Sequence, residues 1–336
     1  MSDVSSKART CGNQGALISI IVPVFNEEDT IAYFLERAIP ALNAACDVVK
    51  AKSDFEIVFV DDGSTDKSAD QIIKAAGENR KIKLISLSRN FGKDAALAAG
   101  LAHAAGDAII PIDVDLQDPP ELIPVMVQKW LGGAYVVNAF RAGRSSDGLL
   151  KRFTAKAFYC LYNAVTAYRI PHNVGDFRLI DREVVDILLQ LPERTRFMKG
   201  LVPWVGFPTD SVDYVRAPRA AGKTKWRYWQ LWNFALDGLT SATTAPLRIW
   251  TYIGTLVSII AFFYALYLIV RVTLYGIDTP GYASLMVVVL FLGGLNMLAL
   301  GILGEYIGRI SIEAKARPLY VIRSTSGFEP NDPRRS

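Results

Sequence analysis

The sequence has few of the residues that build metal centres and disulfide frameworks. It contains three cysteines and two histidines among 336 residues. The cysteines, Cys11, Cys46 and Cys160, have unrelated spacings and form no Cys-x-x-Cys pair. Zinc sites and disulfide-stabilised folds need thiol or imidazole groups at regular spacings. Both kinds of structure are therefore disfavoured.

A strong net charge and a signal sequence are also missing. The 37 Lys and Arg residues exceed the 33 Asp and Glu residues by only four, and the excess is dispersed. This balance predicts no nucleic-acid partner. The first 15 residues are polar and lack the apolar stretch of a signal peptide. We therefore expect the polar part of the chain to stay on the cytoplasmic side of a membrane.

Two nucleotide-binding motifs are absent as well. No Gly-x-Gly-x-x-Gly pattern occurs, which disfavours a dinucleotide-binding enzyme. The triplet Gly222-Lys223-Thr224 is similar to the end of a P-loop, but Ala217 stands where the first glycine of that motif would be. A kinase or an ATPase is therefore disfavoured too.

Two long uncharged runs stand out in a chain that is 51% hydrophobic. Residues 249–270 and residues 279–304 contain no charged side chain, and each run exceeds the roughly 20 residues that cross a hydrocarbon core as a helix. Basic residues flank the pair, whereas the short connection carries one. The positive-inside bias predicts a multi-pass protein of the cell (inner) membrane with both termini in the cytoplasm.

Two other segments combine aromatic and basic residues. Residues 226–248 adjoin the first predicted span, and their aromatic side chains favour an amphipathic helix in the membrane interface. Residues 149–170 have a similar composition. For this segment, an interfacial helix and an ordinary amphipathic core helix are equal alternatives.

The segment from Leu17 onward alternates between strand-like and helix-like patterns. Apolar, β-rich runs occupy residues 17–25, 55–60, 82–87 and 108–112, with helical spacing in residues 27–45, 66–76, 95–105 and 120–130. This order predicts an α/β fold with a mostly parallel, Rossmann-like sheet and helices on both faces. Ligands bind at the carboxyl ends of the strands in such folds.

Polar side chains follow all four of these strands. They are Asn26-Glu27-Glu28, Asp61-Asp62-Gly63-Ser64-Thr65-Asp66, Arg89-Asn90-Phe91-Gly92-Lys93 and Asp113-Val114-Asp115-Leu116-Gln117-Asp118. Their position predicts one site at one edge of the sheet. An Asp-x-Asp pair alone is weak evidence, but here Asp113, Asp115 and the neutral oxygen of Gln117 suit a hard cation, Mg²⁺ or Mn²⁺. We expect Ser64 or Thr65 to cap the following helix.

These motifs resemble family-2 glycosyltransferases of the GT-A fold, and more narrowly the polyisoprenyl-phosphate glycosyltransferases. This subgroup includes bactoprenol glucosyltransferases and dolichol-phosphate-mannose synthases. The resemblance rests on the segments above and on Pro23-Val-Phe-Asn26, Gly175-Asp176-Phe177-Arg178-Leu179, Gly304-Glu305-Tyr306-Ile307-Gly308-Arg309 and Ala316-Arg317-Pro318-Leu319-Tyr320. It covers about residues 17–322. The Gln-x-x-Arg-Trp motif of processive polysaccharide synthases is absent.

The resemblance implies a role for each matching residue. A nucleotide-sugar pocket would be lined by Pro23, Phe25, Glu27, Asp62, Asp113, Val114 and Arg141. The metal ion would be held by Asp113, Asp115 and Gln117, with Asp115 also catalytic. Arg219 and Lys225 would bind the acceptor phosphate, and a solvated surface charge is the alternative for each of them and for Arg141. Asp176 would act on the acceptor, either as a base or by orienting it, while a structural pairing with Arg178 or a turn cap is the alternative.

The implied activity is inverting transfer of one hexose, glucose from UDP-glucose, to a polyprenyl phosphate at the cytoplasmic membrane face. The alternatives are another donor such as GDP-mannose or a modified UDP-sugar, a soluble or glycan acceptor, and a non-catalytic lipid-binding scaffold. A homo-oligomer and a flippase partner are left open. The predicted division is a flexible N-terminus (1–16), a transferase domain (17–225), the interfacial helix (226–248), the membrane region (249–304) and a cytoplasmic tail (305–336).

Overall fold

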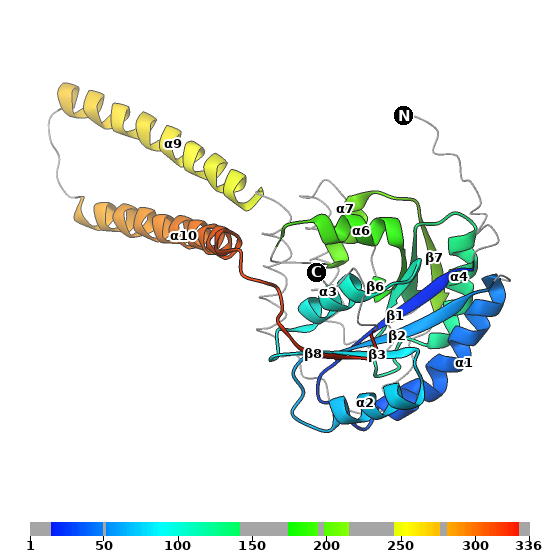
Figure 1. Cartoon of the computed structure of the whole chain (residues 1–336). Coiled ribbons are helices and arrows are strands. Elements are labelled where there is room, and N and C mark those ends of the chain that lie inside the picture. The colour runs from blue at the N-terminus through cyan, green and yellow to red at the C-terminus, as the bar shows by residue number, and fades with distance from the viewer. Residues whose placement is uncertain are drawn as a thin grey trace. The chain divides into compact units, whose positions relative to one another are not determined.

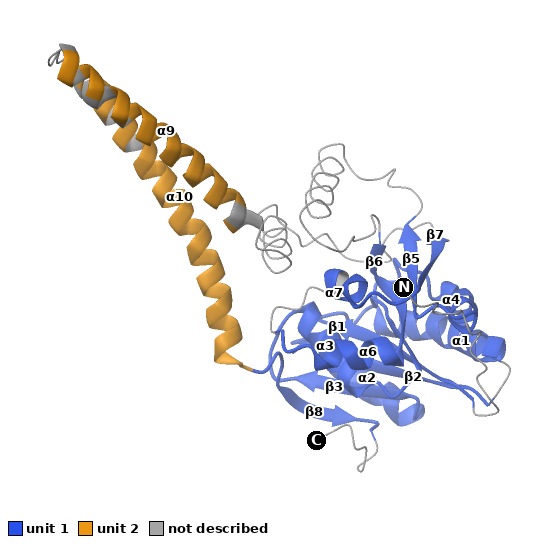
Figure 2. Ribbon diagram, turned by 90° about the horizontal axis from the view of Figure 1, so that it is seen from above, with its two compact units in different colours: residues 1–228, 318–336 blue, residues 229–317 orange. Residues whose placement is uncertain are grey.

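The computed structural model describes residues 15–49, 52–141, 174–193, 198–214, 245–275 and 281–328. The chain divides into two compact units, residues 1–228 with 318–336 and residues 229–317 (Figure 2). The predicted segment 149–170 lies outside the described residues, and so does the predicted interfacial helix up to residue 244.

In the described part of the chain, the first unit is an eight-stranded sheet with helices on both faces (Figure 1). The strands are β1 (Leu17–Val24), β2 (Asp54–Asp61), β3 (Ile82–Leu87), β4 (Ala108–Pro111), β5 (Val136–Arg141), β6 (Val174–Asp181), β7 (Thr209–Tyr214) and β8 (Ile322–Ser326). The helices are α1 (Ile31–Val49), α2 (Ser68–Glu78), α3 (Lys93–His103), the 3-10 helix η1 (Pro120–Leu122), α4 (Ile123–Leu131), α6 (Arg182–Gln190) and α7 (Met198–Val205).

The strand order is β7-β5-β6-β4-β1-β2-β3-β8. Strands β4, β1, β2 and β3 are parallel, and β7 is parallel to β5, whereas β6 and β8 are antiparallel to their neighbours. The α/β prediction with a mostly parallel sheet is confirmed. The carboxyl ends of β1 to β5 and β7 therefore meet the amino ends of β6 and β8 at one edge, which we call the rim.

The apolar runs of the strands are buried between two helical layers. One cluster joins the sheet to α1, α2 and α4, and the other joins it to α3, α6 and α7. In α1 the buried residues Ile31, Phe34, Ala38 and Leu42 recur every three or four positions, as expected for a helix with one apolar face. Phe34 packs edge-on against Phe59 of β2, with ring centroids 5.9 Å apart. These contacts hold the strands rigidly, and so hold the rim.

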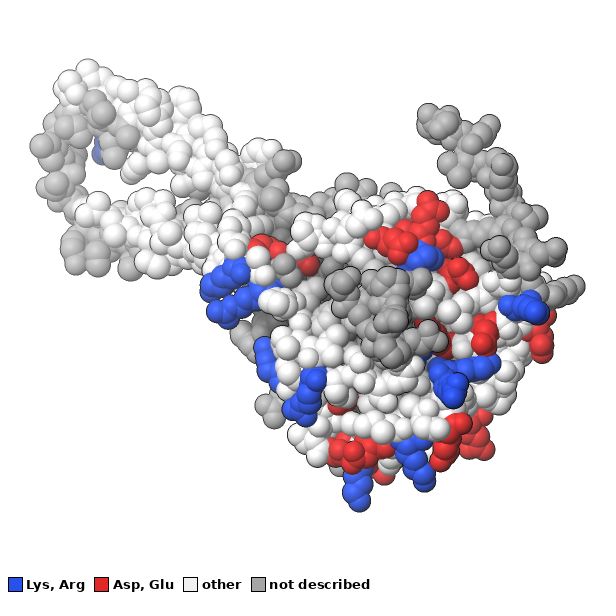
Figure 3. Space-filling model, viewed as in Figure 1, with Lys and Arg blue, Asp and Glu red and all other residues white. Residues whose placement is uncertain are grey.

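The second unit contains two long helices, α9 (Ala245–Tyr275) and α10 (Tyr282–Lys315). Among the described residues, the segment Val287–Lys315 is long and apolar enough to cross a membrane, and α9 contains the shorter apolar stretch Ile249–Tyr264. Figure 3 shows few charged side chains along the visible face of these helices. The structure thus supports one of the two predicted spans, and the second stays a prediction.

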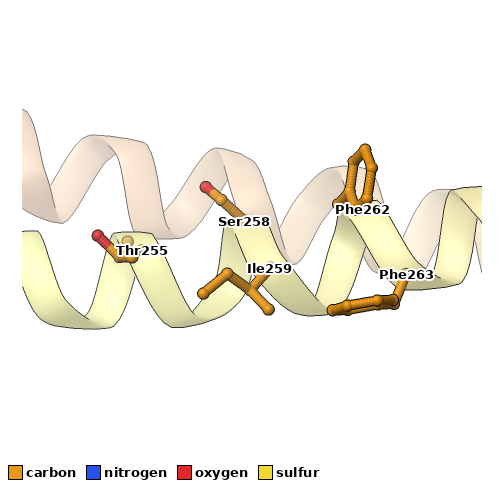
Figure 4. Close-up of a pocket in the computed structure, with 6 residues that line it drawn as sticks. Thr255, Ser258, Ile259, Phe262 and Phe263 are labelled. Carbon is orange, nitrogen blue, oxygen red and sulfur yellow. The ribbon is translucent and has the colours of Figure 1, made fainter.

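A groove on the surface of α9 is lined by Gly254, Thr255, Ser258, Ile259, Phe262 and Phe263. Ser258 and Phe262 project on the same side of the helix (Figure 4). The hydroxyl of Thr255 donates a hydrogen bond to the carbonyl of Thr251 at 2.8 Å, so the helix itself satisfies it. The lining residues include no charged side chain, and the groove therefore lacks the groups that a phosphate or a metal ion needs.

Two helical glycines give substitutions with opposite expected effects. A Cβ atom on Gly100 of α3 would lie 2.3 Å from Cγ2 of Ile21, which is fully buried in β1, whereas Gly77 of α2 has open space around it. We expect Gly100→Ala to lower the free energy of unfolding by about 1–3 kcal/mol through overpacking. Gly77→Ala should raise it by about 0.5–1 kcal/mol, because alanine favours the helix. Thermal unfolding of the purified variants checks both, and equal stabilisation by the two would contradict the close packing of α3 on β1.

Candidate functional site

The loops after β1 and β2 are fastened to each other by side chains. The backbone N–H of Asn26 donates to Oγ of Ser64 at 3.0 Å, and the N–H of Thr65 donates to Oδ1 of Asn26 at 2.8 Å. The N–H of Glu27 donates to Oγ of Ser68 at 2.9 Å. Asn26 adopts a left-handed backbone conformation with φ of 54°, which asparagine tolerates better than most residues. The two loops therefore form one fixed wall of the rim.

The prediction that Ser64 or Thr65 caps the next helix is wrong. Helix α2 begins at Ser68 and its N-cap is Lys67, whose own side chain makes no capping hydrogen bond. The hydroxyl of Ser64 is instead used by Asn26 of the neighbouring loop. Within the turn, Oδ1 of Asp66 accepts from the N–H of Ser68 at 3.0 Å. A long-range contact has taken the group that local capping would have used.

Asp62 fixes the loop that follows β3. Its two carboxylate oxygens accept hydrogen bonds from the N–H groups of Phe91 at 2.7 Å and Gly92 at 2.9 Å. Gly63, with φ of +73°, brings the backbones so close that a Cβ there would lie 2.6 Å from the carbonyl carbon of Arg89. Burial raises the pKa of Asp62, while the two amide hydrogen bonds counteract this shift. The residue predicted to contact the nucleoside thus also supports the β3–α3 loop (residues 88–92).

Lys93, the first residue of α3, joins two carboxylates from different strands. Its ammonium group lies 2.7 Å from Oδ1 of Asp113, which follows β4, and 2.8 Å from Oδ2 of Asp176 in β6. Burial lowers the pKa of Lys93, but the charges of Asp176 and Asp113 outweigh burial and raise it. The structure therefore brings together Asp113 and Asp176, which are predicted to act on the donor and on the acceptor.

The Asp-x-Asp segment turns sharply after β4. Leu116 adopts a left-handed conformation with φ of 55°, and the N–H of Gln117 donates to Oδ1 of Asp115 at 3.2 Å. Val114 and Gln117 are buried, whereas Asp113 and Asp115 are half-buried. The described residues contain no group of three or more His, Cys, Asp or Glu side chains placed to hold a metal ion.

A second charged cluster lies at the ends of β4, β5 and β7. Nε of Arg141 donates to the hydroxyl of Tyr214 at 3.0 Å, and Nη2 of Arg141 lies 3.8 Å from Oδ1 of the buried Asp118. The Tyr214 hydroxyl in turn donates to Asp118. Burial and the Asp118 carboxylate raise the pKa of Tyr214 to about 12, so this hydroxyl stays protonated near neutral pH. Burial lowers the pKa of Arg141, but Asp118 more than offsets that effect and raises it.

The remaining predicted site residues divide between the rim and the segments outside the described residues. Pro23, the next-to-last residue of β1, is half-buried, and Phe25 is exposed. The half-buried Glu27 accepts a hydrogen bond from the Thr30 hydroxyl at 3.2 Å. Arg219 and Lys225 lie outside the described residues. The sequence patterns did not predict a role for Lys93, Asp118 or Tyr214. Lys93 and Asp118 stand in the polar segments that follow predicted strands, and this position was the only sign of a role that the sequence offered for them.

Comparison with known proteins gives matches over most of this chain. Residues 19–188 match the family model described as glycosyl transferase family 2, and residues 245–310 match one described as GtrB C-terminal hairpin. A prophage bactoprenol glucosyl transferase homolog of Escherichia coli K12 is 51% identical over 307 residues, which cover 91% of this chain and 98% of the relative. The bactoprenol glucosyl transferase of Shigella phage SfII is 50% identical, covering 93% and 99%. An uncharacterised glycosyltransferase of Synechocystis is also 50% identical, covering 93% and 96%.

Solved structures give weaker similarities. Mannosyl-3-phosphoglycerate synthase from Rubrobacter xylanophilus has a TM-score of 0.45 and 20% identity, covering 69% of this chain and 74% of that one. Glucosyl-3-phosphoglycerate synthase from Mycobacterium tuberculosis has a TM-score of 0.43 and 21% identity, covering 67% and 78%.

The mostly parallel sheet with a charged rim at its strand ends, together with the family match, defines a glycosyltransferase of the GT-A fold. The chain belongs to glycosyl transferase family 2.

Replacing Asp62 tests its support of the β3–α3 loop. Asparagine keeps one acceptor oxygen but turns an NH₂ group toward a backbone N–H, so one of the two donors loses its partner. We expect Asp62→Asn to lower the free energy of unfolding by about 1–3 kcal/mol. Asp47→Asn makes the same chemical change on the exposed surface of α1 and should stay within about 0.5 kcal/mol. Thermal unfolding compares the two variants, and equal midpoints would refute the supporting role.

Proposed function

We propose that this chain transfers glucose from UDP-glucose to a polyprenyl phosphate, with inversion at the anomeric carbon, at the cytoplasmic face of a membrane. The supporting observation is identity of about 50% to bactoprenol glucosyl transferases over more than nine-tenths of each chain. The match of residues 245–310 to the GtrB C-terminal hairpin adds to it, because a lipid acceptor requires contact with a membrane.

A divalent cation, Mg²⁺ or Mn²⁺, is part of this proposal. Asp113 and Asp115 stand two positions apart after β4, and Asp113 already attracts a cationic group, the ammonium of Lys93. Mg²⁺ is often held by one or two carboxylates together with substrate phosphates, so the absence of a third acidic ligand among the described residues is compatible with this metal. Asp113, Asp115 and the oxygen of Gln117 would hold the ion, which would stabilise the charge of the departing diphosphate.

The rest of the chemistry needs little proton transfer. An oxygen of the acceptor phosphate forms a bond to C1 of glucose, while the bond from C1 to the diphosphate breaks and UDP leaves with the electron pair. A phosphate monoester is largely ionised near neutral pH, since its second pKa lies near about 6. The protein therefore has to bind, align and shield the two anionic substrates rather than create a nucleophile.

Asp176 suits an orienting role in this scheme. One of its oxygens is held by the ammonium of Lys93 at 2.8 Å, and a base would have to give up that contact before accepting a proton. The same ammonium holds Asp113, so Asp176 is fixed relative to the proposed donor site. Pro23, Phe25, Glu27, Asp62 and Val114 would complete the donor side of the rim, and Arg219 and Lys225 the acceptor side.

The proposal includes two membrane spans in the second unit. Helix α9 has 31 residues and α10 has 34, and each exceeds the length that crosses a hydrocarbon core. Basic residues flank the pair, which favours cytoplasmic termini. The transferase domain would then lie where both the nucleotide sugar and the lipid phosphate are available.

Incubation of the purified full-length protein with radiolabelled nucleotide sugars, Mg²⁺ and undecaprenyl phosphate tests the proposal. We expect label from UDP-glucose in the lipid phase. Transfer only from GDP-mannose or from another UDP-sugar would correct the donor, and transfer without any lipid phosphate would point to a different acceptor. A lipid phase without label from every donor would favour a non-catalytic scaffold.

Asp115→Asn tests the metal proposal. The substitution keeps the size of the side chain and removes one charge from the cation site, so we expect activity to fall by about 10²–10³-fold. Binding of Mn²⁺ in the presence of UDP should weaken in parallel, as measured by electron paramagnetic resonance. Asp47→Asn serves as the distant control and should change neither quantity. Normal activity of Asp115→Asn at limiting metal would refute the assignment.

Asp176→Asn tests the acceptor role. We expect slower transfer, by about 10²-fold, with an unchanged dissociation constant for UDP-glucose, because Asp176 would help to orient the arriving acceptor rather than bind the donor. Asp186→Asn is a matched control, since Asp186 is an exposed carboxylate paired with Arg182 on α6. Kinetics and titration with UDP-glucose separate the two effects. An equal loss of donor binding and transfer would place Asp176, through Lys93, in the donor pocket.

A further inference from the structure

We propose that Asp118 and Tyr214 are positioning residues that hold the guanidinium group of Arg141 in place for a phosphate of one of the two substrates. This inference rests on the proposed function, which supplies two phosphate-bearing substrates. Asp118 follows β4, Arg141 ends β5 and Tyr214 ends β7. Residues far apart in the sequence thus meet at one corner of the rim, beside the amino end of β6.

The hydrogen bonds in this cluster have a defined direction. The Tyr214 hydroxyl has one proton, which it donates to Asp118, so its lone pair is available to accept from Nε of Arg141 at 3.0 Å. The Asp118 side chain is only 4% exposed and anchors the chain of contacts inside the protein. Tyr214 is itself held by the core, because its ring packs edge-on against Phe177 with centroids 6.3 Å apart.

This arrangement keeps the outer edge of the guanidinium available. Asp118 lies 3.8 Å from Nη2 and is linked to Arg141 chiefly through the Tyr214 hydroxyl, rather than by a two-pronged ion pair that would occupy two N–H groups. The Arg141 side chain remains 27% exposed. Among the described residues, the outer N–H groups of Arg141 are therefore held in a fixed orientation and have no hydrogen-bond partner, as a site for an anion requires.

Gly175 provides the space that Arg141 needs. A Cβ atom on Gly175 would lie only 2.8 Å from Nη2 of Arg141, so the guanidinium lies flush against the backbone of β6. The next residue is Asp176, the group proposed to act on the acceptor. A fixed cation at this point would hold a phosphate group beside the Asp176 carboxylate.

Tyr214→Phe removes the hydroxyl that links Asp118 to Arg141 and keeps the ring that packs on Phe177. We expect the KM for one phosphate-bearing substrate to rise about tenfold, with a smaller change in kcat, because the guanidinium loses one partner and its fixed orientation. A rise confined to undecaprenyl phosphate assigns the anion to the acceptor, and a rise confined to UDP-glucose assigns it to the donor. Tyr135→Phe is the matched control. Tyr135 directly precedes the first residue of β5, whereas Arg141 is the last residue of that strand, so this substitution should leave both KM values unchanged.

Two further variants separate positioning from a purely structural role. Gly175→Ala should displace Nη2 without touching the contact between Tyr214 and Asp118, and it should raise the same KM as Tyr214→Phe. In an Arg141→Ala background, Tyr214→Phe should cause no additional loss, because it acts only through the guanidinium. A full additional loss in that background would overturn the proposal. So would KM values within twofold of wild type for both Tyr214→Phe and Gly175→Ala.

Direct binding keeps this test independent of the proposed activity. Titration of wild type and Tyr214→Phe with UDP-glucose and with undecaprenyl phosphate in detergent measures the same anion site without turnover. If wild type binds one of these molecules but transfers no glucose, the proposed function fails, while weaker binding by Tyr214→Phe still supports positioning. If Tyr214→Phe binds UDP-glucose as tightly as wild type does, and undecaprenyl phosphate as tightly as wild type does, the positioning role is overturned while the proposed function is unaffected.

Discussion

The rim depends on the two backbone hydrogen bonds that Asp62 accepts. They fix the N–H groups of Phe91 and Gly92, and Gly92 immediately precedes α3. The first residue of that helix is Lys93, so the position of its side chain follows from the position of the loop. Lys93 then reaches Asp113 after β4 and Asp176 in β6. One buried carboxylate after β2 therefore supports the position of Lys93 on α3 and, through it, the contacts with groups on two other strands, β4 and β6.

The other end of the chain supports the same loop. The N–H of Ser88 donates to the carbonyl of Val321 at 2.8 Å, and Arg323 donates to the carbonyl of Ser88 at 3.3 Å. Strand β8 runs along the edge of β3 (Figure 1). Only residues 316–321 separate the end of α10 from this strand. The helix proposed to span the membrane is thus joined by a short connection to a strand that braces the rim.

The sequence predicted the parallel half of the sheet and the residues that follow its strands, because those strands are long apolar runs. Strands β7 and β8 were not predicted, and their composition explains why. In β7 only Val212 and Tyr214 are buried, and β8 is polar and largely exposed. Both are edge strands, so the apolar pattern that marks a buried strand is absent from them. The partners of Lys93 and Tyr214 depend on strand order, which local sequence patterns do not encode.

The arrangement of charges explains how a set of acidic motifs can serve anionic substrates. Asp113 and Asp176 would repel each other and any phosphate if they faced the site alone, but both contact the ammonium of Lys93. Asp118 is similarly matched by Arg141 and is covered, with 4% of its side chain exposed. The cationic partners stay accessible, since the Lys93 side chain is 41% exposed and that of Arg141 27%. Because Asp113, Asp176 and Asp118 are each paired with a cation within the protein, an approaching phosphate meets the exposed groups of Lys93 and Arg141, which these carboxylates hold in place.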